Sequence, residues 1–185
     1  MIGSGRQTDQ DGFTLMELLI VVAIISIIVA IAIPGLLRSR MTGNEASAIA
    51  TLRVTTSSQV AYAAACGQGA FADGYVTLGT AGSGTPFVPP DLAMAAPVKS
   101  GFQFALGAST QGGGVTTPAD CNGTQTVGGF YGTATPVGPG TTGARAFAVN
   151  TTMTIWQNIN PTAAPTESQM SGPPVGGVSP ISPIQ

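Results

Sequence analysis

The clearest hydrophobic pattern in the chain is an unbroken apolar run near the N-terminus. From Phe13 to Leu37 the only ionisable side chain is Glu17. An apolar stretch of about 20 residues is long enough to cross a bilayer as a helix. A carboxylate within such a helix is costly, so by default it marks a functional position. The pattern predicts a membrane-spanning helix over residues 13–37 in which Glu17 has a specific role.

A second helical pattern follows the apolar run, over residues 38–66. Proline inside a helix removes a backbone hydrogen bond and clashes with the preceding turn, so we expect a kink or local unwinding at Pro34 and Gly35. Beyond it, apolar positions recur at spacings of three and four. Glycine commonly ends a helix, so we expect this one to end at Cys66 and Gly67. We expect the face that carries Ile49, Leu52, Thr56, Val60 and Ala63 to be buried and the face that carries Asn44, Ser47, Thr51, Ser58 and Tyr62 to be exposed.

The length of this helix limits where it can lie. A helix from Phe13 to Cys66 would extend for roughly 80 Å at 1.5 Å per residue. A compact domain of this size cannot contain such a rod. Its first half must therefore lie in a membrane or among other subunits.

The rest of the chain predicts a small antiparallel sheet. Residues 67–98 are rich in glycine, proline and small side chains and read as a connecting region. Short strand patterns occupy residues 102–106, 129–134, 146–149 and 153–156, and the last two flank a hairpin turn. Three or four strands within residues 99–157 could cover the amphipathic helix, an α+β fold. The Pro- and Gly-rich residues 158–185 predict an extended tail.

Composition excludes several functions. Charged residues make up 8% of the chain and the net charge is −2, which gives no basic surface for nucleic acid. The chain has no histidine, so no Ser-His-Asp or Cys-His nucleophile system can form, and we expect no enzymatic activity. The glycine pairs and triplets do not stand between a strand and a helix, as phosphate loops do. We also expect no cofactor and no metal site, since Asp and Asn residues do not cluster.

Two cysteines and two sequons suggest covalent modifications. If the part after the apolar run is exported, Cys66 and Cys121 reach an oxidising compartment, where a disulfide is expected. Such a bridge would join the helix end to the sheet and stabilise the fold by roughly 4 kcal/mol in the chain-entropy description. Asn122 and Asn150 each begin an Asn-X-Thr pattern and are weak candidates for glycosylation, because chance matches are common in a Thr-rich chain.

The first twelve residues have an unusual relation to the apolar run. In a secretory signal peptide the small residues at the cleavage site follow the apolar segment, whereas here Gly12 precedes it. Cleavage between Gly12 and Phe13 would remove residues 1–12 as a leader and leave the apolar helix as the new N-terminus. The alternative is that residues 1–12 are a cytoplasmic tail.

The orientation in the membrane has two opposing indicators. Arg6 precedes the span, while Arg38, Arg40 and Arg53 follow it, and this charge count alone would place the C-terminal side inside. A Gly-, Thr- and Pro-rich head with two cysteines is typical of an exported segment. We give the composition more weight and expect the head outside the cytoplasm.

The stretch Gly12-Phe13-Thr14-Leu15-Met16-Glu17, with its apolar helix and Pro34, resembles the N-terminal signature of type IV pilins and pseudopilins, in a type IVa-like form. The resemblance implies that a prepilin peptidase cleaves after Gly12 and that Phe13 becomes N-methylated. It implies that the helix waits in the bacterial inner membrane before the assembly machinery draws it into a helical homo-oligomeric filament. There Glu17 would pair with the Phe13 amine of a neighbouring subunit.

The sequence departs from the family pattern in two places. The leader carries Asp9 and Asp11 with Arg6 as its only basic residue, whereas many pilin leaders are more basic. In type IVa pilins the cysteines usually bracket a loop near the C-terminus, whereas here Cys66 ends the helix and Cys121 lies in mid-head. The adhesive role of that loop therefore does not transfer.

Three functions remain open from the sequence. The first is a pilin that forms a surface filament for adhesion, twitching motility or DNA uptake. The second is a major pseudopilin of a type II secretion system, in a periplasmic pseudopilus. The third, of another class, is a membrane-anchored binding module that does not polymerise.

Overall fold

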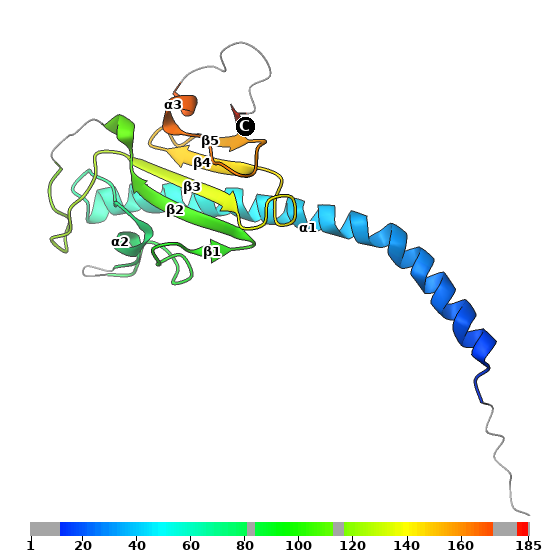
Figure 1. Ribbon diagram of the computed structural model, residues 1–185. Coiled ribbons are helices and arrows are strands. Elements are labelled where there is room, and N and C mark those ends of the chain that lie inside the picture. The colour runs from blue at the N-terminus through cyan, green and yellow to red at the C-terminus, as the bar shows by residue number, and fades with distance from the viewer. Residues whose placement is uncertain (1–11, 81–83, 113–116, 172–180, 185) are drawn as a thin grey trace, which may run out of the picture. The chain divides into compact units, whose positions relative to one another are not determined.

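The computed structural model describes residues 12–80, 84–112, 117–171 and 181–184, and it divides into two compact units, residues 1–38 and 39–185 (Figure 1). One long helix, α1 (Leu15–Ala65), spans the boundary between them. The predicted leader, residues 1–12, lies outside the described residues except for Gly12. The remaining elements belong to the second unit, which we call the head.

The first unit is the apolar half of α1. Every side chain from Leu15 to Leu37 is exposed in the isolated chain, and the helix is long and apolar enough to cross a membrane. Helical structure continues through Pro34 and Gly35, so the single chain shows no unwinding there. The kink expected at Pro34 and Gly35 stays a prediction.

The head contains a six-stranded antiparallel sheet in the order β1-β2-β3-β4-β5-β6. Its strands are β1 (Val98–Lys99), β2 (Phe102–Ala108), β3 (Phe130–Pro136), β4 (Ala146–Asn150), β5 (Ile155–Asn158) and β6 (Ile181–Pro183). Three short helices accompany them, α2 (Tyr75–Gly79), the 3₁₀ helix η1 (Thr110–Gly112) and α3 (Glu167–Met170). This is the expected α+β arrangement, with two more strands than the sequence pattern indicated.

The C-terminal region differs from the expected extended tail. Ile181–Pro183 pairs with β5 as an edge strand, and Glu167–Met170 forms α3. A three-residue strand is too short to show a periodic pattern of side chains. It pairs with β5 through backbone groups, which nearly every residue carries, so its sequence gives no signal for a strand. Pro183 suits an edge strand, because a proline has no N–H to offer to a further strand.

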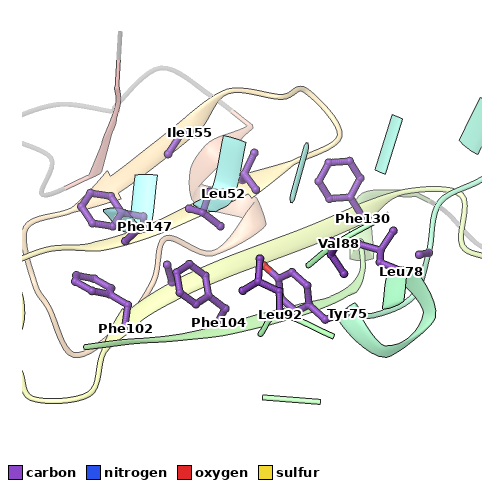
Figure 2. Packing of buried hydrophobic residues seen from close by; sticks show 14 of the residues in the cluster. Leu52, Tyr75, Leu78, Val88, Leu92, Phe102, Phe104, Phe130, Phe147 and Ile155 are labelled. Carbon is purple, nitrogen blue, oxygen red and sulfur yellow. The ribbon is translucent and has the colours of Figure 1, made fainter. Parts of the chain in front are cut away.

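The second half of α1 lies across one face of the sheet and forms the core with it (Figure 1). Leu52 and Tyr62 of α1 join the aromatic side chains of β2, β3 and β4 in one buried cluster (Figure 2). Phe102 and Phe104 are buried while Gln103 is exposed, the period-two alternation that the sequence predicted for β2.

The buried face of α1 is not the one that the apolar pattern predicted. Val60 is 44% exposed, and Ile49, Thr56 and Ala63 are only partly covered, so of that face only Leu52 is fully buried. The residues of α1 that are buried are Glu45, Ala48, Thr51, Leu52, Thr55, Ser58, Gln59 and Tyr62. Three of them, Thr51, Ser58 and Tyr62, belong to the face expected to be exposed, and that expectation was wrong.

The polar side chains on this buried face are tolerated because they are hydrogen-bonded. Ser58 donates to the carbonyl of Phe87 at 2.7 Å, and Gln59 exchanges two bonds of 2.9 Å with the backbone of Ala72. Buried polar groups cost little when such partners are present. Hydrophobic periodicity cannot detect these partners, which lie elsewhere in the chain.

The end of α1 is joined to the head by the expected disulfide between Cys66 and Cys121, which are 55 residues apart. Next to it, the Tyr62 hydroxyl donates to Oδ2 of Asp120 at 2.7 Å, and Oδ1 accepts from the N–H groups of Asn122 and Thr124. Burial raises the pKa of the Asp120 carboxyl, but these hydrogen bonds lower it by more, so the net pKa is lowered. The carboxylate holds the turn that contains Cys121 against the helix.

Candidate functional site: the processing and assembly segment

The predicted cleavage point lies in an accessible part of the chain. Gly12 and Phe13 precede α1, and the Phe13 side chain is 85% exposed. A Cβ atom built on Gly12 would meet no described atom within 4 Å. Folding of the described residues therefore does not require glycine at position 12, which leaves recognition by another protein as a reason for it.

Thr14 and Glu17 form a reciprocal cap on the first turn of α1. The Glu17 N–H donates to Oγ1 of Thr14 at 3.2 Å, and Oε2 of Glu17 accepts from the Thr14 N–H at 3.0 Å and from its hydroxyl at 2.7 Å. This is a capping box, in which two otherwise unpaired donors of the helix end are satisfied. No hydrogen bond to the second oxygen, Oε1, is found among the described residues.

This role of Thr14 was not predicted from the sequence, although a local signal for it exists. A Ser or Thr followed three residues later by Glu, just before an apolar run, is the signature of a capping box. Thr14 was identified only as part of the stretch that resembles a known family. The geometry gives it a physical function in this chain, to orient the Glu17 carboxylate at the start of the helix.

The rest of the apolar segment satisfies its own polar groups. The Ser26 hydroxyl donates to the carbonyl of Val22 at 2.8 Å, a bond that needs no outside partner. Packing within the described chain does not require glycine at position 35, since a Cβ atom there would meet nothing within 4 Å. Glycine inside a helix costs about 1 kcal/mol relative to alanine, so this position is a weak point of α1.

The other predicted site residues lie in the head. Asn122 is exposed, and its glycosylation stays a prediction. Asn150 is only 3% exposed, and its Oδ1 accepts bonds from the N–H and hydroxyl of Thr152. The folded head thus disfavours modification of Asn150. Within the described ranges no three His, Cys, Asp or Glu residues lie close enough to hold a metal ion.

One comparison with known proteins gives a match. A family model described as the prokaryotic N-terminal methylation motif matches residues 8–33. The match covers Gly12, the Thr14–Glu17 cap and most of the apolar helix, and this motif is the class III signal peptide of type IV pilins and pseudopilins. No curated protein and no solved structure matches the chain. The motif implies a structural protein, and the motif together with the apolar helix is consistent with a membrane-anchored precursor.

Proposed function

We propose that the chain, once cleaved after Gly12, is the structural subunit of a type IV pilus-like filament. The observation that supports this most directly is the position of one carboxylate. Glu17 is the only ionisable side chain of the exposed apolar residues 13–37, and it lies four residues after the Phe13 amine that cleavage within the methylation motif would create. An apolar helix needs to be covered by lipid or by copies of itself.

The capping box suggests how Glu17 passes between the two environments. In the precursor, Oε2 is occupied by Thr14 of the same chain, which reduces the cost of keeping a carboxylate near the membrane. Oε1 is left to accept a hydrogen bond from the Phe13 ammonium of a neighbouring subunit. A buried ion pair contributes little net stability, and its best-attested use is to fix register.

The processing steps follow from the motif. A prepilin peptidase would cleave between Gly12 and Phe13 on the cytoplasmic side and Phe13 would be N-methylated, while the head folds outside the inner membrane. Oxidation of Cys66 and Cys121 fits an extracytoplasmic compartment. The filament would then emerge at the cell surface or, if the chain serves a type II secretion system, remain a periplasmic pseudopilus.

The experiment that tests the proposal is mass spectrometry of the N-terminus in a sheared-filament fraction. The expected species begins at Phe13 and carries one added methyl group. Intact residues 1–12 in polymer would contradict the proposed cleavage. Absence of the chain from any sheared or pelleted polymer would contradict the filament proposal. Long sheared filaments indicate a pilus, whereas polymer seen only with the secretion apparatus indicates a pseudopilus.

A matched pair of variants separates assembly from membrane anchoring. Glu17→Ala should abolish polymer while the chain remains in the membrane. Ser26→Ala, in the same helix, removes a hydroxyl that bonds only to its own backbone and should leave assembly intact. Unchanged surface display of Glu17→Ala, with no polymer from the wild type or from either variant, would instead support a membrane-anchored binding module, and normal polymer from Glu17→Ala would contradict the role of this carboxylate in assembly.

A further inference from the structure

The head contains a buried carboxylate without a cationic partner. Glu167, the first residue of α3, is only 5% exposed, and its Oε2 accepts from the N–H and the hydroxyl of Thr110 at 2.6 and 2.5 Å. Its Oε1 is buried and no described residue donates a hydrogen bond to it. A buried carboxylate ordinarily has a paired cation or a complete set of donors. Glu167 has only part of such a set.

The surroundings of Glu167 keep it charged. Burial raises the pKa of the Glu167 carboxyl, but the neighbouring Ser109 and Thr110 hydroxyls and the Thr110 N–H lower it by more, so its net pKa is below the ordinary value. Burial, together with the charge of Glu167, also raises the pKa of Tyr131 to about 12. The site therefore holds a full negative charge at neutral pH.

The cations of the sheet are committed elsewhere. Lys99 pairs with Asp91 and Arg145 pairs with Glu45, each at 2.7 Å. The chain has six Lys and Arg residues, and the other four are Arg6, Arg38, Arg40 and Arg53, in the leader and on α1. The residues of the head outside the described ones, 81–83, 113–116, 172–180 and 185, include no Lys or Arg. Among the described residues no cation is paired with Glu167, which leaves this carboxylate available to a cation from outside the chain.

A pocket lies beside Glu167 and is large enough to admit a small cationic group. It has a volume of about 280 Å³, is open to the surface, and is lined by Ala108, Thr110, Tyr131, Thr166, Glu167 and Ser168. The lining combines one carboxylate with neutral hydroxyls. Calcium prefers six to eight oxygen ligands, usually with several carboxylates, which this lining does not supply. Guanidinium and ammonium groups bring their own directional donors and need a single carboxylate.

We propose that this pocket binds a guanidinium or primary ammonium group, with Glu167 as the counter-charge and the neighbouring hydroxyls as acceptors. The group belongs either to a small free amine or to a Lys or Arg side chain of a second copy of this chain. The inference does not depend on the filament proposal, because the site is complete in one head.

The test is an NMR titration of the full chain in detergent micelles with n-butylguanidinium, n-butylammonium, n-butanol and calcium chloride as separate probes. The two cations should cause saturable shifts of the Thr110, Tyr131 and Ser168 amides, and n-butanol should not. Glu167→Gln, which keeps an acceptor for Thr110, should weaken cation binding at least ten-fold. The matched control Asp73→Asn removes an exposed carboxylate and should bind as the wild type does.

A second variant keeps the test valid if Glu167→Gln fails to fold. Ser168→Trp narrows the pocket from its rim without touching the Thr110 bonds, and it should also abolish the shifts. Unsaturable shifts, equal cation affinity in Glu167→Gln, or stronger binding of calcium or n-butanol would each overturn the proposal.

Measurements of self-association distinguish the two possible sources of the cation, a small free amine and a side chain of a second copy. If a second copy supplies it, Glu167→Lys should lower sedimentation of the assembled chain, whereas Asp73→Lys, at an exposed carboxylate, should not. If the probes bind but these variants assemble as the wild type does, the ligand is a small free cation. Because binding is measured on single chains, failure of binding would leave the filament proposal untouched.

Discussion

Arg145, directly before β4, and Glu45 on α1 are joined across 100 residues of sequence. The guanidinium donates from Nε and Nη2 to Oε2 of Glu45 at 3.0 and 2.7 Å, and the backbone N–H groups of Ala144 and Arg145 donate to Oε1. Nη1 of Arg145 reaches Gln157 on β5. One buried carboxylate thus ties the helix to the segment that leads into β4 and, through Arg145, to β5.

This ion pair predicts a large loss of stability on truncation. Arg145→Met should lower the free energy of unfolding by about 3 kcal/mol, because it leaves the Glu45 carboxylate, whose side chain is 7% exposed, without its cation. The measurement is urea unfolding of the full chain in micelles, followed by the fluorescence of the single tryptophan, Trp156.

The matched control is the other ion pair of the head. Lys99 and Asp91 are also 2.7 Å apart, but their side chains are 39% and 51% exposed. Lys99→Met should change the free energy of unfolding by less than about 1 kcal/mol, as is usual for surface pairs. An equal loss of unfolding free energy in both variants would show that the buried Glu45–Arg145 pair stabilises the fold no more than the exposed pair does.

The lowered pKa of Asp120 predicts an acid-dependent contribution to stability. A carboxyl group with a lower pKa in the folded than in the unfolded chain stabilises the fold above the unfolded value, about 3.9, and this contribution disappears as the pH falls through the folded pKa. Asp120→Asn should therefore be less stable than the wild type at pH 7, and the difference should shrink below about pH 4. Urea unfolding at a series of pH values measures it, and a constant difference would contradict the assignment.

The disulfide predicts a third effect on stability. Replacing both Cys66 and Cys121 by serine should lower the free energy of unfolding by about 4 kcal/mol, since the bridge closes a loop of 55 residues. Treating the wild type with a reductant should give a similar loss and should not affect the double variant. A stability unchanged by reduction would mean that the bridge does not constrain the unfolded chain.

The parts of the fold that the sequence revealed are those with a local pattern. The apolar helix was predicted from its unbroken apolar run and β2 from its period of two residues, and these elements and β4 were predicted close to their observed limits. The buried face of α1 was mispredicted because Ser58 and Gln59 depend on partners far away in sequence. The Glu45–Arg145 pair escaped prediction for the same reason.

The candidate site was predicted to a different degree. Gly12, Phe13 and Glu17 were identified by resemblance, and the match to the methylation motif confirms the recognition. The pairing of Glu17 between subunits remains a prediction, because a single chain contains no neighbour. The Thr14 cap was not predicted, although its Thr-x-x-Glu signature is local to this segment.

The capping box gives the last prediction, which concerns the start of α1. Thr14→Val keeps the side-chain shape but removes the hydroxyl that bonds both the Glu17 N–H and its carboxylate, and valine is a poor N-cap residue. The amides of Glu17 and Leu18 should therefore exchange with solvent faster in micelles, as measured by hydrogen exchange. Thr14→Ser restores a hydroxyl at the same position and should recover most of the protection. If Thr14→Val exchanges as slowly as the wild type, the surrounding micelle rather than the cap holds the first turn, and Glu17 would have to be oriented by another partner.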